Sequence, residues 1–394
     1  MKKFLFSLML CIVFAGYSFA QQDIIDIGQD IGKSASQVKA DENDKDLFNI
    51  LGTEKNAAED TRNQDIKNEE KSENKGILDK ISDYFFGEDI PVSEISKSQS
   101  ETQEDFVSRL ESIAEEGDLK TQKALAYMYL YGKNDFVTDY QKAFKYYEMA
   151  ANQGDATALN NLGSLYFNGV GVPVNYQKAI ELFEKAAAAG SSEAALNLGF
   201  IYLSGRNASS NATHAVELFK MSAEKNNVIA KFMLGYAYYK GFGIEKNMNK
   251  GAALVKEAAD MDFDEAQYII GYMYLNGFGI AKNYENARKY MQHAMRQGNM
   301  SAIMELARLE TEGTQLAENP FDAYILYSIA SVMGEKTAPE KRDAIEGKIK
   351  RENLPQAQST AENFKPKASP ITEYARKTFG KNIRRYIEEN VKKK

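Results

Sequence analysis

The chain has little of what most catalytic and metal sites require: its 394 residues include one cysteine, two histidines and no tryptophan. Cys11 lies in a segment that we expect to be cleaved, so the mature chain could form neither a disulfide nor a thiolate metal site. His214 and His293 lie far apart, without a second His or Cys at metal-ligand spacing. The chain has no Gly-x-Ser-x-Gly motif, no Ser-x-x-Lys with its partner motifs, and no evident carboxylate pair. We therefore predict no catalytic residues, no metal and no cofactor.

A basic excess is also missing. The net charge of −7 argues against a nucleic-acid partner. Acidic side chains are concentrated in residues 21–103, where 20 acidic residues stand against 10 basic ones and aromatic residues are few. Such a segment cannot bury enough apolar area to offset the entropy of ordering it. We expect it to be a largely disordered acidic leader.

Only the start of the chain is strongly apolar, and that run is short. Lys2 and Lys3 precede the apolar residues 4–14, and Ser18-Phe19-Ala20 has the small-x-small pattern that signal peptidase reads. The run is too short to span a bilayer. We predict a signal peptide over residues 1–20, and hence an exported protein that is either periplasmic or secreted.

What the chain does contain is a repeat with a fixed period of 36 residues. One glycine recurs at Gly163, Gly199, Gly235 and Gly271, and a tyrosine three places on recurs at Tyr166, Tyr202, Tyr238 and Tyr274. A period of this length indicates stacked helix-turn-helix units, each of which packs on its neighbours. We predict an all-α solenoid of about six such repeats. The four glycines should leave room for the second helix of each unit to approach the first.

The repeats have distinct flanks. We assign residues 104–119 to an N-terminal capping helix, 120–335 to the repeats and 336–364 to closing helices. Residues 365–394 carry 10 basic and 3 acidic side chains together with an apolar stripe. This basic amphipathic tail could contact anionic lipid or an acidic partner, or could fold onto the leader or the last repeat. We favour docking within the protein.

The repeat resembles the Sel-one-like repeat family, a relative of the tetratricopeptide repeat. Residues 158–190 show its pattern in full as Leu162-Gly163, Tyr166, Gly169, Gly171-Val172, Lys178-Ala179, Lys185-Ala186-Ala187 and Gly190. The resemblance spans about residues 120–334 and implies a right-handed α-solenoid that binds proteins or peptides. Exported bacterial members act as periplasmic regulators of signalling and as envelope or host-interaction factors. Relatives linked to β-lactam binding carry one disulfide per repeat, and this chain lacks those cysteines.

A candidate binding surface follows from the solenoid geometry. The first helix of each unit should line the concave side, where residues beside the Leu-Gly pair face the groove. Exposed aromatic groups in a row suit a peptide ligand, although the same side chains could instead pack against the neighbouring helix. The candidate partner-binding residues are Asn161, Asn197, Phe200, Phe232, Tyr236, Tyr239, Tyr268 and Tyr272.

Three functions remain open from the sequence. The first is an exported, non-enzymatic scaffold, adaptor or regulator that binds a protein or peptide through the concave face. The second is an envelope enzyme acting on cell wall or β-lactam, which only scattered acidic residues could support. The third is a membrane-associated assembly or host-interaction factor that uses the basic tail. We favour the first, because the chain combines an export signal and a solenoid with no catalytic motif.

Overall fold

The computed structural model describes residue 97 and residues 101–205, 210–313 and 318–391. The predicted signal peptide and nearly all of the predicted acidic leader lie outside the described residues. Every described residue belongs to one compact unit, residues 95–394.

These residues form sixteen α-helices and one short 3-10 helix. In chain order the helices are α4 (Gln103–Glu115), α5 (Leu119–Tyr131), α6 (Tyr140–Asn152), α7 (Ala156–Asn168), α8 (Tyr176–Ala188), α9 (Ser192–Ser204), α10 (Ala212–Glu224), α11 (Val228–Lys240), α12 (Met248–Asp260), α13 (Asp264–Asn276), α14 (Tyr284–Arg296), α15 (Met300–Glu312), α16 (Pro320–Val332), α17 (Ala338–Glu346), η1 (Arg351–Asn353), α18 (Leu354–Glu362) and α19 (Pro370–Val391).

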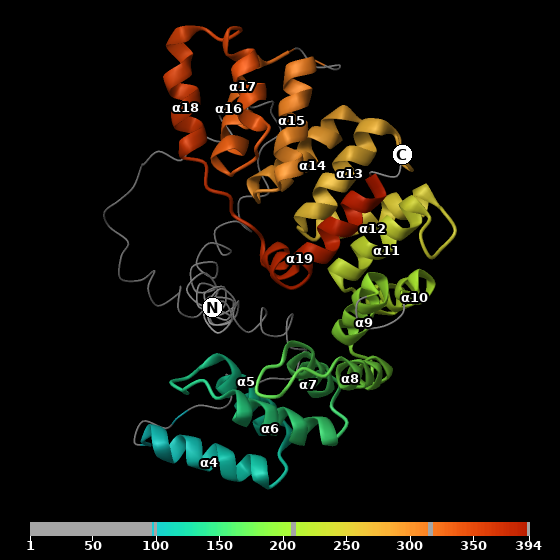
Figure 1. Cartoon of the computed structure of the whole chain (residues 1–394), viewed down its shortest axis with the longest axis vertical. Helices are drawn as coiled ribbons and strands as arrows, with labels where there is room; N and C mark the ends of the chain where they lie inside the picture. The colour runs from blue at the N-terminus through green and yellow to red at the C-terminus, as the bar shows by residue number, and fades with distance from the viewer. Residues whose placement is uncertain (1–96, 98–100, 206–209, 314–317, 392–394) are drawn as a thin grey trace, which may run out of the picture. The chain divides into compact units, whose positions relative to one another are not determined.

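The 36-residue period appears directly in the helices. The first helices α7, α9, α11, α13 and α15 each have 13 residues. They begin at residues 156, 192, 228, 264 and 300, so that successive helices in this set are 36 residues apart. Each first helix packs against its own second helix, which then packs against the next first helix (Figure 1). The predicted all-α solenoid is confirmed.

Side-chain caps set where the helices begin. The residue before each second helix accepts a hydrogen bond from the first turn of that helix and so satisfies a donor with no intrahelical partner. These caps are Asp139, Asn175, Asn211, Asn247, Asn283 and Asn319. Five of the six first helices are capped in the same way, by Asp118, Asp155, Ser191, Asn227 and Asn299. The exception is α13, whose N-cap residue is Phe263 and makes no side-chain cap.

The repeat glycines lie where the two helices of a unit meet. A Cβ added to Gly235 would lie 2.9 Å from the backbone nitrogen of Val255 and 3.0 Å from the carbonyl oxygen of Gly251, both in α12. A Cβ on Gly163 would lie 2.9 Å from the Phe183 ring in α8. Any side chain at these positions would push the second helix away from the first.

Further helices lie at both ends of the stack, and α17 and α18 are shorter than the repeat helices. Helix α4 packs on α5, and α16 packs on both α17 and α18. None of the helices in the described part of the chain combines the length and the hydropathy that a membrane span needs.

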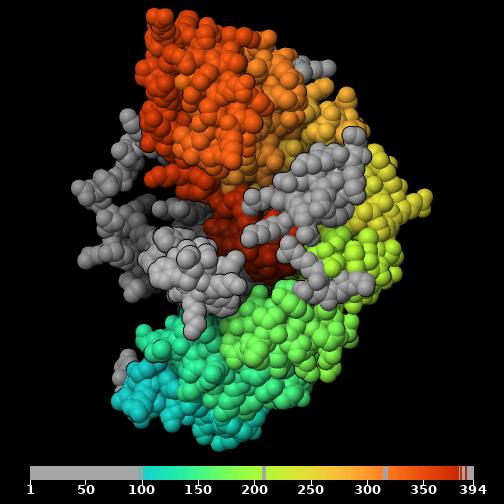
Figure 2. Space-filling model, in the orientation of Figure 1, coloured from blue at the N-terminus to red at the C-terminus, as the bar shows by residue number. Residues whose placement is uncertain are grey.

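The basic tail forms α19, which turns back along the chain. It contacts α11, and its side chains reach α9 and the start of α13 (Figures 1 and 2). The tail therefore docks within the protein, as favoured from the sequence, but on the middle repeats and not on the last one. The alternative of docking on the leader falls outside the described residues.

Candidate functional site

The candidate residues lie on a surface formed by α7, α9, α11 and α13, which we call the first-helix face. The candidate side chains differ in their exposure to solvent. Phe200, Phe232, Tyr236 and Tyr239 are buried, whereas Asn161, Asn197, Tyr268 and Tyr272 are half-buried. A partner could therefore reach the second group directly, but could reach the first only after a rearrangement. Binding by these eight residues stays a prediction.

Five aromatic side chains on this face contact one another in succession, and we call them the aromatic row: Phe232, Tyr236, Tyr239, Phe278 and Tyr272. Each neighbouring pair of ring centroids is 6.0 Å apart. The Lys240 ammonium lies 4.8 Å from the centroid of Tyr239, within range of a cation–π interaction. Burial raises the pKa of Tyr239 to about 12, so its hydroxyl is neutral at physiological pH. The sequence pattern missed Phe278, because it lies in the turn after α13 and not in a helix.

The two candidate asparagines are used partly within the solenoid. The Asn197 amide donates to the side-chain oxygen of Asn160 at 3.0 Å, and the Asn160 amide donates to Asn161 at 3.3 Å. The first bond joins α9 to α7, and the second lies within α7. A peptide backbone would have to compete with them or use the groups that remain.

Helix α19 covers part of the first-helix face with an apolar stripe. Ile371, Ala375, Phe379 and Ile383 recur every four residues, which places them on one side of a helix, and all four are buried. The Phe379 ring stacks on Phe200 with centroids 4.4 Å apart and planes 20° apart. Phe200 is 3% exposed because its open side meets this ring.

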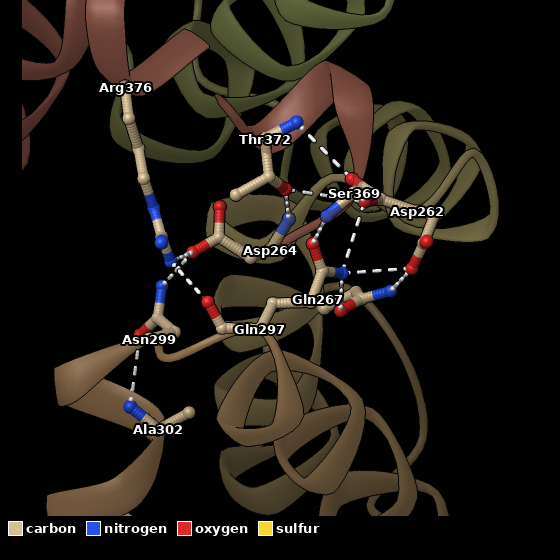
Figure 3. Close-up of polar contacts among 9 residues, drawn as sticks. All are labelled: Asp262, Asp264, Gln267, Gln297, Asn299, Ala302, Ser369, Thr372 and Arg376. Atoms are coloured by element: carbon tan, nitrogen blue, oxygen red, sulfur yellow. Dashed lines mark hydrogen bonds and ion pairs between the residues drawn. The ribbon is translucent and has the colours of Figure 1, made fainter. Parts of the chain in front are cut away.

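The start of α19 supplies the cap that α13 lacks (Figure 3). The Thr372 hydroxyl accepts a hydrogen bond from the backbone N–H of Asp264 at 3.1 Å and lies 3.4 Å from the carbonyl oxygen of Asp262, to which it donates. The Ser369 hydroxyl donates to that same carbonyl at 2.7 Å and also caps α19 itself, accepting from the N–H of Thr372. One segment therefore begins its own helix and completes the start of another.

An ion pair between the half-buried Arg376 and the buried Asp264 holds the next turn of α19. An Arg376 guanidinium nitrogen lies 2.6 Å from the Asp264 carboxylate and 2.9 Å from the carbonyl oxygen of Gln297. The Asp264 side chain is 1% exposed and also accepts from the Asn299 amide at 3.0 Å. Removing Arg376 would leave the buried Asp264 carboxylate without its ionic partner, which is unfavourable, although solvent at the exposed part of Arg376 weakens the pair. The pair therefore favours a docked α19.

Replacing Thr372 with valine should weaken the docking while keeping the side-chain shape. The change removes the acceptor for the Asp264 amide, so we expect a loss of about 1 kcal/mol, the usual value of a helix cap. Hydrogen exchange should become faster at the start of α13 and along α19. Thr378→Val is the matched control, because Thr378 lies on the exposed side of α19. Equal exchange in the two variants would refute the cap assigned to Thr372.

The histidines show no metal arrangement. Nδ1 of His214 lies 3.3 Å from Glu217, and the His214 ring packs against Tyr202. Within the described part of the chain, no three His, Cys, Asp or Glu side chains lie together so as to hold a metal ion.

The sequence matches a known repeat family. The Sel1 repeat model matches five consecutive stretches, residues 120–155, 156–191, 192–227, 228–263 and 264–299. The sixth predicted unit lies outside these matches, although α15 and α16 keep the helix length and the period. No curated protein matches the chain in sequence.

A comparison with solved structures also found similar proteins. A Sel1 repeat protein from Oxalobacter formigenes is 25% identical with a TM-score of 0.52, and the match covers 58% of this chain and 94% of that one. A protective antigen present in uropathogenic Escherichia coli strains, displaying an SLR fold, is 23% identical with a TM-score of 0.48, over 69% of this chain and 66% of that one. An immunity protein from Pseudomonas aeruginosa is 23% identical with a TM-score of 0.33, over 63% and 87%. The shared fold rests on the first of these.

Proposed function

The chain is a Sel1-like repeat protein, and on that premise we propose that it is an exported, non-enzymatic adaptor that binds a protein or peptide through the first-helix face. One observation carries this proposal: the face already holds a helix, α19, by means of side-chain-specific contacts. A surface that selects a hydroxyl, a guanidinium and an aromatic ring at defined positions has the properties of a peptide-recognition site.

The aromatic row supports the same proposal. Tyrosine and phenylalanine contribute much of the binding energy at protein interfaces. The row continues past the buried Tyr239 to Tyr272, which is half-buried. Tyr268, one helical turn before Tyr272, is also half-buried. A partner therefore has accessible aromatic surface on α13 even while α19 is docked.

Membrane contact through the tail is less favoured in the docked conformation. The apolar stripe of α19 is buried against the repeats, so lipid could reach it only after release of the helix. Export rests on the predicted signal peptide alone.

An affinity capture with the chain from residue 21 to residue 394 tests the proposed function. We would compare the parent with a Tyr268→Ala, Tyr272→Ala variant and with Tyr176→Ala, a matched control whose tyrosine lies on α8 and is 42% exposed. We expect an envelope protein that the parent and the control retain and the double variant loses. Equal retention by all three would place binding elsewhere. Capture of nothing, together with substrate turnover, would support an enzyme instead.

A further inference from the structure

The repeats depart from their own pattern at the place where α19 docks. The five other first helices carry Asp, Ser or Asn as N-cap, but α13 carries Phe263. The Phe263 ring is fully buried and packs edge-on against Phe232 at 5.3 Å. The missing acceptor comes from Thr372, which lies 108 residues away from Asp264 in the sequence. The first turn of α13 is therefore complete only when another helix is present.

Buried polar side chains of the repeats surround this point. Asp264, Gln267, Gln297 and Asn299 are each at most 4% exposed. Gln297 donates to Gln267 at 3.0 Å and to the Asp262 carbonyl at 3.1 Å, and its side-chain oxygen accepts from the N–H of Ser369 at 2.9 Å. Burial of so many polar groups is costly unless each finds a partner, and α19 supplies several of those partners.

The first repeat shows how the same structure looks without a docked helix. Gln153 donates to Gln122 at 2.8 Å and to the Gly117 carbonyl at 3.0 Å, as Gln297 does in the fifth repeat. There, however, Asp118 caps the first helix and Gln153 is exposed. The glutamine pair is therefore found also where no helix docks. The features specific to the docking point of α19 are the missing N-cap of α13 and the buried Asp264.

We propose that the surface formed by α9, α11 and the start of α13 recognises an amphipathic helix of a partner protein, and that α19 occupies this surface in the resting chain as an intramolecular competitor. This inference rests on the proposed function and names the class of partner. The contacts of α19 define what the partner helix must carry. Positions are counted from the residue after an N-cap serine or threonine, which corresponds to Ser369 in α19. The partner helix needs a hydroxyl at position 3 and an arginine at position 7. It needs apolar side chains at positions 2, 6, 10 and 14.

Each of these side chains contacts a particular group on the repeats. The hydroxyl caps α13 through the Asp264 amide, and the arginine neutralises the buried Asp264 carboxylate. The tenth residue, Phe379 in α19, stacks on Phe200. The helix runs from the fifth repeat toward the third, opposite to the order of the repeats in the sequence. A helix in the reverse direction would present neither the N-cap nor the arginine to Asp264.

The tether makes α19 an effective competitor. Seven residues, 363–369, connect α18 to α19, and a short flexible linker gives an effective concentration in the millimolar range. A partner helix with micromolar intrinsic affinity would therefore bind the resting chain weakly. Weakening the contacts of α19 should raise the apparent affinity of the partner without changing the surface that it binds.

The test uses a fluorescently labelled synthetic peptide of residues 367–391 as probe and the chain from residue 21 to residue 394 as receptor. The released receptor carries Arg376→Ala and Phe379→Ala, and hydrogen exchange along α19 reports its release. The matched control carries Lys377→Ala and Thr378→Ala on the exposed side of the same helix. Fluorescence anisotropy should show that the released receptor binds the probe about 100-fold more tightly than the parent and the control do. A probe with Arg376→Ala and Phe379→Ala should not bind.

Each other outcome overturns the inference. Equal binding by parent and released receptor would show that α19 does not compete. A receptor whose α19 exchanges freely but which binds no probe would show that the surface does not recognise a helix. Continued protection of α19 in the double variant would show that Arg376 and Phe379 are not its anchors. Failure of the proposed function is distinct, because probe binding without a captured envelope protein leaves helix recognition standing and removes the exported-adaptor function.

Discussion

Replacing Gly279 with alanine should lower the free energy of unfolding by about 3 kcal/mol. This loss is large for a substitution that adds one methyl group and removes no side-chain contact. Gly279 has a φ of 71°, a conformation that costs an L-residue about 1–2 kcal/mol. An added Cβ would also overlap the carbonyl oxygen of Met248, at the start of the second helix in the preceding repeat. Because that atom belongs to a helix backbone, the two repeats would have to separate, which adds about 1–3 kcal/mol.

Gly277 in the same turn provides the control. Its φ of 74° gives the same backbone strain, but its added Cβ would meet the Cγ of Lys282 at 2.9 Å, and that side chain can move away. Gly277→Ala should therefore cost about 1 kcal/mol. Urea unfolding of the two variants beside the parent measures both values. Equal losses would mean that Gly279 serves only the turn conformation and not the contact between repeats.

Most of the solenoid could be predicted from the sequence because its information is local and repeated. The period fixes which residues share a helix, and the polar residue before each apolar run marks the start of that helix. Asn175 and Asn247, for example, begin α8 and α12. These signals depend on neighbours within one turn, so reading the chain in order is enough to find them.

The burial of Phe200 under α19 could not be predicted in this way. Periodicity places Phe200 and Tyr236 on the first-helix face, but it does not show whether a non-repeated segment lies over that face. The docking of α19 joins residues more than 100 positions apart, as Thr372 and Asp264 show. One local signal was available: Phe263 stands where the other first helices carry a cap, which indicates that the cap comes from elsewhere.

The second large effect is expected at the junction of the first two repeats, where Asp155→Ala should cost about 4 kcal/mol. The Asp155 carboxylate caps α7, accepting from the N–H of Ala158 at 2.7 Å. Its other oxygen lies 2.9 Å from the Lys123 ammonium of α5, whose side chain is only 2% exposed. Alanine removes the cap, which is worth about 1 kcal/mol, and leaves a buried unpaired ammonium, which costs about 3–5 kcal/mol.

Ser191→Ala separates the two contributions. Ser191 caps α9 at the equivalent position of the next repeat through the N–H of Ala194, but it has no buried lysine to neutralise, so its loss should stay near 1 kcal/mol. Adding Lys123→Met to Asp155→Ala removes the unpaired buried ammonium. It should recover most of the difference in unfolding free energy between Asp155→Ala and Ser191→Ala, because apolar side chains often replace a buried ion pair at little net cost. Urea unfolding of the three variants beside the parent completes the comparison. If the methionine gave no recovery, the loss in Asp155→Ala would come from the cap, and the ion pair would contribute nothing to joining the first two repeats.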